Sequence, residues 1–279
     1  IRFPQTRMGV EQVYMDYFTR AKEYDQALKG TASAKKGTET TPVRRNLELE
    51  ALAEIINKKR FITCHSYVQS EITMLMRVAE QFGFRVNTFT HILEGYKVAD
   101  KMKEHGVNAS SFSDWWAYKY EVIDAIPYNG AILHNMGVNV GFNSDDAEMA
   151  RRLNQEAAKA VKYGKVSEEE AWKFVTLNPA KMLHIDNRVG SIKIGKDAEL
   201  VLWNNNPLAI YAKPEKTFVD GICEFDIEQD KKLRQTIQDE RNRIAQKMLK
   251  AKQGGAATQD AAPHRQHLYH CNDHQPGTQ

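Results

Sequence analysis

The pattern of apolar side chains differs between two parts of the chain. The amino-terminal part has the spacing of amphipathic helices, and the part after it alternates short apolar runs with helical patterns. Residues 10–28 and 44–58 each place their apolar side chains on one face of a helix. From residue 61 to residue 163, short apolar runs recur at intervals of roughly 25 residues, with helical patterns between them. This alternation predicts an α/β fold in which parallel strands are joined by right-handed crossovers and covered by helices.

Four apolar runs are expected to form the strands of this region, namely residues 61–65, 86–91, 107–114 and 138–142. Helices should follow the first two runs and end near Gly83 and Gly106, with further helices near residues 124–136 and 147–163. A TIM-type barrel and an open doubly wound sheet both agree with this order. A nucleotide-binding domain is disfavoured because no Gly-rich phosphate loop follows any of the runs.

The pattern changes after residue 186. Residues 190–203 contain short β-like runs between Gly turns, and residues 216–222 indicate a hairpin with Asp220-Gly221 as its turn. Residues 227–252 have the spacing of a highly charged helix. Residues 253–279 are rich in Gly, Ala, Gln and Pro, a composition that predicts a disordered tail.

Composition excludes several classes of protein. The net charge of +3, from 39 basic and 36 acidic residues, argues against a dedicated nucleic-acid-binding protein. No apolar run approaches the roughly 20 residues of a membrane span, and three widely separated cysteines form neither a CxxC motif nor a disulfide framework. The chain begins with Ile, so no targeting segment can be assigned, and a cytoplasmic and an exported location both stay open.

Polar side chains with catalytic potential fall at the ends of the predicted strands. His65 and His91 each close one run, and Asp145 follows another. Two imidazoles and a carboxylate are the ligand types of a hydrolytic metal site, in which a carboxylate can accept the proton of a metal-activated water. Spacing alone also agrees with histidines that only make structural hydrogen bonds, and with a 144–146 segment that only caps a helix through Ser144 or Asp146.

Several longer motifs carry a resemblance to a known family. They are FNSDDAE at residues 142–148, NPAK at 178–181, GSI at 190–192, GKDAELV at 195–201, NPL at 206–208 and VDG at 219–221. In this order and spacing they resemble the amidohydrolase superfamily, and the imidazolonepropionase-like hydrolases within it. Glu199 stands where the family usually has Asp.

The resemblance implies a fold and a set of site residues. Residues 1–186 would form the C-terminal half of a TIM-like (β/α)8 barrel, strands five to eight, followed by part of a composite β-sandwich at 187–226 and the charged helix. His65 and His91 would bind the metal, zinc by default, in one or two ions, and Asp145 would touch the metal and move the proton. Four further side chains near the strand ends could bind substrate: Tyr67, Glu94, Tyr96 and Asp114.

One part of the family pattern is absent from this sequence. No His-x-His pair occurs anywhere in the chain, although the family places one on strand one of the barrel. We therefore expect a fragment whose open sheet edges make it unstable alone or self-associating, with little activity of its own.

The expected activity is hydrolysis of C–N bonds in non-peptide amides, including cyclic amides, by a metal-activated water. Hydrolysis of Xaa-Pro dipeptides and of phosphotriesters fits the same scaffold, because fold does not choose the substrate. The alternative from another class is a non-catalytic binding or scaffold protein derived from a hydrolase. The expected partner is a small amide or dipeptide, with a homo-oligomer as a further possibility.

Overall fold

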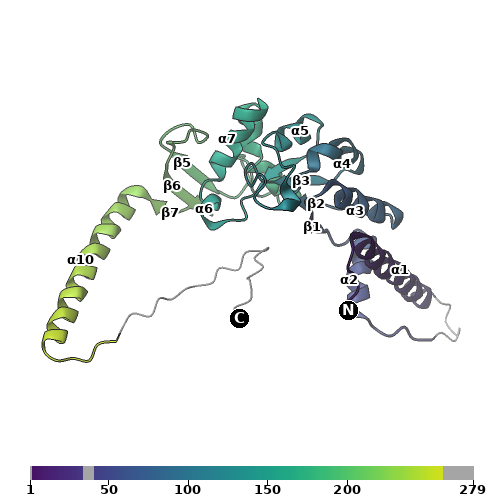
Figure 1. The fold of residues 1–279 in the computed structure, drawn as a ribbon, viewed down its shortest axis with the longest axis horizontal. Helices are drawn as coiled ribbons and strands as arrows, with labels where there is room; N and C mark the ends of the chain where they lie inside the picture. The colour runs from purple at the N-terminus through teal and green to yellow at the C-terminus, as the bar shows by residue number, and fades with distance from the viewer. Residues whose placement is uncertain (1, 34–40, 260–279) are drawn as a thin grey trace.

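The computed structural model describes residues 2–33 and 41–259 (Figure 1). The greater part of the tail that we expected to be disordered, from residue 260 onward, lies outside the described residues. The molecule is elongated: α1 and α2 lie at one end, the strands lie in the middle, and α10 lies at the other end. The middle part therefore holds every strand end that the sequence marks as a candidate site.

A four-stranded parallel sheet forms the centre of the fold. Its strands are β1 (Thr63–His65), β2 (Thr88–Thr90), β3 (Asn108–Ser111) and β4 (Val140–Phe142), and they neighbour one another in chain order. All four fall within the predicted runs and are shorter than predicted. The parallel sheet of βα units that the apolar pattern indicated is confirmed.

The two faces of this sheet differ in polarity. Register places Cys64, Phe89, Ala109 and Val140 in one row, and these side chains belong to or pack against the main apolar core. The neighbouring row pairs His65 with Thr90 and Ser110 with Gly141. Because side chains alternate between the faces of a strand, the helices cover the first row, and polar groups occupy the other face.

The covering helices are the ones that follow each strand. They are α3 (Gln69–Gln81), α4 (Ala99–His105), α5 (Asn129–Asn135) and α7 (Leu153–Gly164), and each contributes buried side chains to the core around Phe89. Helices α8 (Glu168–Lys173) and α9 (Leu177–Met182) come after α7. Two short 3-10 helices lie between strands and helices, η1 (Gly95–Val98) and η2 (Tyr120–Val122).

The first two helices pair with each other at the amino-terminal end. Helix α1 (Arg7–Ala32) and helix α2 (Leu47–Ile56) bury Ala21, Tyr24 and Leu49 between them. Side chains cap both helices: Thr6 accepts a hydrogen bond from the Gly9 amide, and Asn46 accepts one from the Leu49 amide. Both helices were predicted from apolar spacing, with slightly different ends.

Two helices differ from their prediction. The helix expected over 124–136 begins only at Asn129, because Pro127 disfavours helical backbone at Ile126. The single helix expected over 147–163 is two helices, α6 (Ala147–Ala150) and α7. Arg152, with φ −129° and ψ 29°, leaves the helical region between them.

A three-stranded antiparallel sheet follows the α/β region. Its strands are β5 (Leu200–Trp203), β6 (Pro214–Val219) and β7 (Ile222–Asp226), in that order. The predicted hairpin turn is confirmed: Asp220 and Gly221 have φ of 51° and 79°, as a two-residue turn with left-handed backbone requires. The β-like run expected around 190–195 forms turns instead.

The last helix is α10 (Ile227–Gln253), which Asp226 caps by accepting hydrogen bonds from the Glu228 and Gln229 amides. It projects away from the rest of the molecule (Figure 1), and none of its residues is buried. Neither α10 nor any other helix in the described ranges combines the length and apolar character of a membrane-crossing segment.

Candidate active site at the strand ends

Parallel pairing brings the three predicted site residues together. His65 is the last residue of β1, His91 directly follows β2, and Asp145 lies shortly after β4. The imidazole rings of His65 and His91 lie 4.5 Å apart between centroids. The Nε2 atom of His91 lies 3.9 Å from Oδ2 of Asp145. His91 is thus the central member of this group.

The environment of His91 is unusual for a histidine. The residue is only 2% exposed, and neither ring nitrogen has a hydrogen-bond partner among the described residues. Burial lowers the pKa of His91 to about 4; nearby Asp145 works against this, and His65 and Lys119 add to it. A buried polar group without a partner costs free energy, so its retention needs a specific explanation, such as a bound ion.

Another histidine of the same sheet region shows the contrast. His105, at the end of α4, has its Nδ1 2.7 Å from Oε1 of Glu80, and its Nε2 accepts a hydrogen bond from the Val86 amide. Both of its nitrogens are therefore used within the fold. His105 therefore has a structural role, because both ring nitrogens form hydrogen bonds that hold the fold together. The ring nitrogens of His91 form no such hydrogen bonds within the described residues.

The backbone around the site is held in sparsely populated conformations. Positive φ angles occur at His91 (60°), Trp115 (67°), Ala117 (51°) and Asp145 (55°). Non-glycine residues adopt this region infrequently, and such residues cluster at functional sites where the surrounding structure enforces them. The indole Nε1 of Trp115 donates a hydrogen bond to the carbonyl of Ser144, which ties the loop after β3 to the segment that carries Asp145.

The helix cap that we expected at Ser144 or Asp146 is Asp146, which leaves Asp145 without a capping role. Asp146 is the N-cap of α6, and its Oδ1 accepts hydrogen bonds of 2.9 Å from the amides of Glu148 and Met149. The Asp145 side chain is 31% exposed and faces His91. Its carboxylate therefore stays available for a ligand or a proton.

Lys119 belongs to this region, although sequence reasoning gave it no role beyond membership of the aromatic segment at residues 113–120, a possible substrate wall. Its Nζ lies 3.4 Å from Oη of Tyr67 and 4.4 Å from the centre of the Tyr67 ring. The Tyr67 ring in turn lies 5.9 Å from the His91 ring. Lys119 sits in the loop between β3 and η2, where no periodic pattern marks it; the surrounding aromatic segment at residues 115–120 is its only sequence signal.

The other predicted substrate-binding residues have different surroundings. Buried Glu94 accepts a hydrogen bond from the Gln69 amide at the start of α3, and the Tyr96 hydroxyl donates to the Asp124 carbonyl. Asp114 pairs with Lys159, which also lies 2.9 Å from Glu156. Within the described ranges, Glu94, Tyr96 and Asp114 form no hydrogen bond or ion pair with the side chains of His65, His91 and Asp145, so their substrate-binding role stays a prediction.

The donor types fit a zinc ion, although their positions do not enclose one. Two imidazoles and a carboxylate form a ligand set found in zinc hydrolases, and the unpartnered nitrogens of His91 offer such an ion a lone pair. However, no three His, Cys, Asp or Glu side chains of the described residues are grouped closely enough to hold a metal. Binding would require the exposed side chains of His65 and Asp145 to move toward His91.

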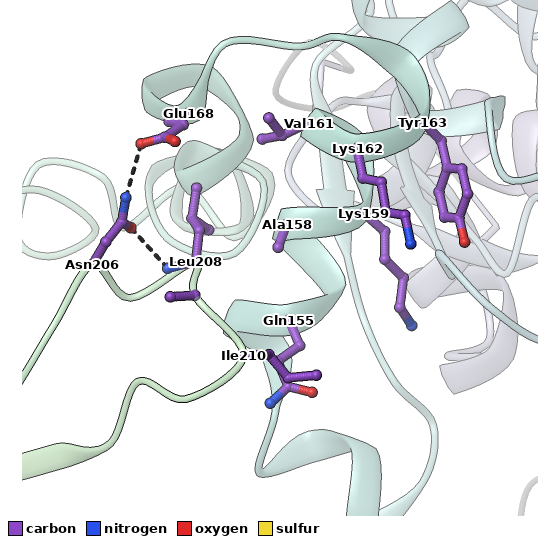
Figure 2. A pocket seen from close by; sticks show the side chains of 11 residues that line it. Gln155, Ala158, Lys159, Val161, Lys162, Tyr163, Glu168, Asn206, Leu208 and Ile210 are labelled. Atoms are coloured by element: carbon purple, nitrogen blue, oxygen red, sulfur yellow. Dashed lines mark hydrogen bonds between the residues drawn. The ribbon is translucent and has the colours of Figure 1, made fainter.

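Two pockets of the described surface differ in their relation to the three site residues. A pocket of about 500 Å³ lies between α7, the start of α8 and the loop at 206–210. Figure 2 shows its wall, in which Glu168 accepts a hydrogen bond of 3.0 Å from the Asn206 amide group. Its lining includes none of the predicted site residues. A smaller pocket of about 230 Å³, with His65 and Tyr14 in its wall, opens beside β1.

Comparison with known proteins agrees with the motifs and the fold. The model of the amidohydrolase family matches residues 48–229. The chain is 27% identical over 232 residues to amidohydrolase tasK of Hapsidospora irregularis. The matched region is 80% of this chain and 24% of that protein. It is 34% identical over 112 residues to the urease alpha subunit of Yersinia pestis, covering 34% of this chain and 19% of that subunit.

Solved structures show the same relationship. An amidohydrolase from Thermotoga maritima superimposes with a TM-score of 0.70 at 32% identity, covering 80% of this chain and 57% of that one. A zinc-bound adenosine deaminase from Xanthomonas campestris shares the fold with a TM-score of 0.51 at 17% identity, covering 82% and 62%. The chain thus spans about a quarter of amidohydrolase tasK and little more than half of the Thermotoga protein. The family match covers more than half of this sequence, and the chain belongs to the amidohydrolase family.

Proposed function

We propose that this chain carries part of the active site of a metal-dependent hydrolase, namely the part at the carboxyl ends of β1 to β4. The hydrolase would cleave C–N bonds of small amides, including cyclic amides. The observation that supports this most strongly is His91, a buried imidazole without a hydrogen-bond partner in the described part of the chain, between a second imidazole and a carboxylate. Family membership agrees with it, and the names of two relatives, an amidohydrolase and a urease, belong to enzymes of C–N hydrolysis.

Each of the three residues has a distinct role in this proposal. His65 and His91 bind the ion, zinc by preference for imidazole and carboxylate ligands, through a neutral ring nitrogen. Burial favours the neutral form of His91, since its pKa lies at about 4. Zinc, when bound, supplies a positive charge that lowers the pKa of a water molecule. Asp145 would accept a proton from the attacking water and deliver it to the leaving nitrogen.

The proposal includes a place for the central sheet in a larger architecture. We assign β1 to β4 to strands five to eight of a (β/α)8 barrel within residues 1–186, and residues 187–226 to part of a composite β-sandwich. The parallel order of the strands supports this, as does the likeness to 57% of the Thermotoga chain. In such a barrel the active site lies at the carboxyl ends of the strands, the edge at which His65, His91 and Asp145 meet.

A second candidate substrate class is suggested by Lys119. A cation next to Tyr67 and His91 can bind a substrate carboxylate, which a dipeptide carries and a simple amide does not. Dipeptide hydrolysis, including that of Xaa-Pro substrates, would then use the same metal ligands and the same Asp145. Substrates with and without a free carboxylate, assayed side by side, distinguish the two classes.

The proposal is tested first by metal content. The tail of the full chain contains four histidines and one cysteine, side chains that could also take up zinc. They are replaced so that they contribute none to the measurement; the changes are His264→Ala, His267→Ala, His270→Ala, Cys271→Ser and His274→Ala. Zinc per chain is then measured by elemental analysis after dialysis. We expect bound zinc in this background and its loss on His91→Ala or His65→Ala.

A matched control separates ligand loss from damage to the fold. His134 lies on α5, where its ring contacts Phe174 edge-on, and His134→Ala should leave the zinc content unchanged. Equal zinc in all the variants, or no zinc in a folded sample, would contradict the proposed site. A zinc-bound preparation is then assayed for release of amine from amides, cyclic amides and dipeptides.

A further inference from the structure

Helix α7 carries a buried carboxylate that has no part in the proposed zinc site. Glu156 is 3% exposed. Its Oε2 accepts a hydrogen bond from the Ser113 hydroxyl, and its Oε1 lies 2.9 Å from Nζ of Lys159. Burial of a charge costs free energy, and apolar side chains of similar volume often stabilise a fold as well as a buried ion pair does. Stability alone therefore does not account for a charge at this position, and its contacts indicate what else it does.

These contacts join α7 to the loop that follows β3. Three side chains of α7, spaced so that they share one face of the helix, contact three residues of this loop. The contacts are Glu156 with Ser113, Lys159 with Asp114, and Tyr163 with Trp116. Ser113 is as deeply buried as Glu156, so solvent does not compete for the hydrogen bond between them. One face of α7 thus holds the beginning of the loop.

The same loop contacts the surroundings of the strand-end site at two points. The indole Nε1 of Trp115 donates a hydrogen bond of 3.1 Å to the carbonyl of Ser144, the residue directly before Asp145. Further along the loop, Nζ of Lys119 lies 3.4 Å from Oη of Tyr67. The loop therefore connects α7 to segments that adjoin the proposed metal ligands.

The backbone of this loop needs fixed ends. Trp115 and Ala117 have φ of 67° and 51°. Residues other than glycine persist in this region when the surrounding structure fixes them. The hydrogen bond of Ser113 precedes the two strained residues, and the fully buried side chain of Val122 follows them. Loss of the Ser113 contact should therefore let the loop relax to a different conformation.

We propose that Glu156 is a positioning residue for the strand-end site. By holding Ser113 it fixes the loop after β3, which keeps Trp115 bonded to the segment that carries Asp145. Within the described ranges Glu156 forms no hydrogen bond or ion pair with the proposed metal ligands, so it acts through the loop. The consequence for zinc rests on the proposed function, whereas the position of the loop can be measured without metal.

The first test follows the loop in the metal-free full chain. Proton–nitrogen correlation NMR detects the indole of Trp115, and the Trp115→Phe variant assigns its signal. We expect Glu156→Ala and Ser113→Ala to shift this signal. The amide of Ala117, which donates to the Val122 carbonyl, should exchange its hydrogen at least about tenfold faster in both variants. Glu156→Gln keeps an acceptor oxygen for Ser113, so its Trp115 signal should stay close to that of the parent chain.

Asn154→Ala is the matched control on the same helix. Asn154 is also buried, but its Nδ2 donates a hydrogen bond of 2.7 Å to the carbonyl of Pro207, outside the loop after β3. This variant should leave the Trp115 signal in place and change exchange in the loop by less than about twofold. A Trp115 signal that Glu156→Ala leaves unchanged, or that Asn154→Ala shifts equally, would overturn the proposal. If Glu156→Ala does not fold, Ser113→Ala decides by the same criteria, since it removes only a hydroxyl group.

The second test measures zinc affinity in the chain with the substituted tail, by competition with a chromophoric chelator. Residues that orient metal ligands typically change metal affinity by roughly 10–100-fold when they are replaced. We expect Glu156→Ala and Trp115→Phe each to raise the zinc dissociation constant about tenfold. The double variant should raise it no further, because both changes interrupt the same path to Asp145.

Unchanged zinc affinity in Glu156→Ala, or effects of the two changes that simply add, would overturn the role of Glu156 in positioning the site. A folded parent chain without zinc would instead contradict the proposed function. In that case the metal-free NMR and exchange measurements still decide whether Glu156 holds the loop, so the two failures are distinguishable.

Discussion

The rings of His65 and His91 lie 4.5 Å apart because β1 and β2 pair in parallel with His65 opposite Thr90. Strict alternation along β2 would place His91 on the face of Phe89, toward the apolar core. The positive φ of His91 interrupts this alternation directly after the strand. The left-handed backbone of His91 thus occurs at the point where its ring lies beside the ring of His65 at the sheet edge.

His91 should make the stability of the metal-free chain depend on pH. The folded pKa of about 4 lies below the ordinary value of 6.5, so the unfolded chain takes up a proton first as the pH falls. The free energy of unfolding should therefore decrease from about pH 6.5 down to about pH 4, and this contribution should be complete above pH 6.5. Urea denaturation in the presence of a chelator, repeated across this range, measures the effect.

The His91→Asn variant provides the comparison for this prediction. Asn tolerates the left-handed backbone of this position and does not titrate. Its free energy of unfolding should decrease less steeply than that of the parent chain between pH 6.5 and pH 4. Parallel curves for the two chains would show that His91 is not held neutral in the folded state.

The core on the helix side of the sheet should respond strongly to truncation at Phe89. This ring is fully buried in the central strand β2, so Phe89→Ala should lower the free energy of unfolding by about 3–5 kcal/mol. Phe61→Ala removes the same ring from a residue that is 58% exposed, and it should cost at most about 1 kcal/mol. Denaturant midpoints of the two variants decide this, and equal losses would contradict the assignment of the core.

The strands, and the position of His65, His91 and Asp145 at or beyond strand ends, could be predicted because they leave local marks on the sequence. Short apolar runs indicate buried parallel strands, and His65, His91 and Asp145 stand at or beyond their ends. Helix ends were less predictable: Pro127 excludes the first turn expected for α5, and the break at Arg152 has no comparable mark. Motif order, rather than periodicity, selected the family.

Features that depend on distant segments could not be predicted. The burial of His91 requires Phe112 and Tyr67, whose rings lie 4.9 Å and 5.9 Å away, to come from other segments. Lys119 reaches Tyr67 across a loop that carries no helical or strand pattern. Such contacts arise from the chain path, so a linear reading of the sequence assigns these residues no partner.

Lys119 should contribute to the binding of substrates with a free carboxylate. Lys119→Met keeps most of the apolar stem and removes the charge beside Tyr67. In a zinc-bound, active preparation the KM for a dipeptide should rise about tenfold or more, while the KM for an uncharged amide should change little. Steady-state kinetics on both substrates measures this, and equal changes in KM would assign Lys119 a structural role.

Adjacent Asp145 and Asp146 should respond in opposite ways to substitution. Asp146→Ala removes the cap of α6, so it should lower the free energy of unfolding by about 1 kcal/mol and leave zinc binding intact. Asp145→Asn keeps the size of a side chain that tolerates its φ of 55°, so stability should change little. The loss of a proton acceptor should lower kcat by at least about 100-fold in a zinc-bound preparation. Unfolding curves and kinetics of both variants separate the two roles, and an active Asp145→Asn enzyme would remove Asp145 from the proposed proton transfer.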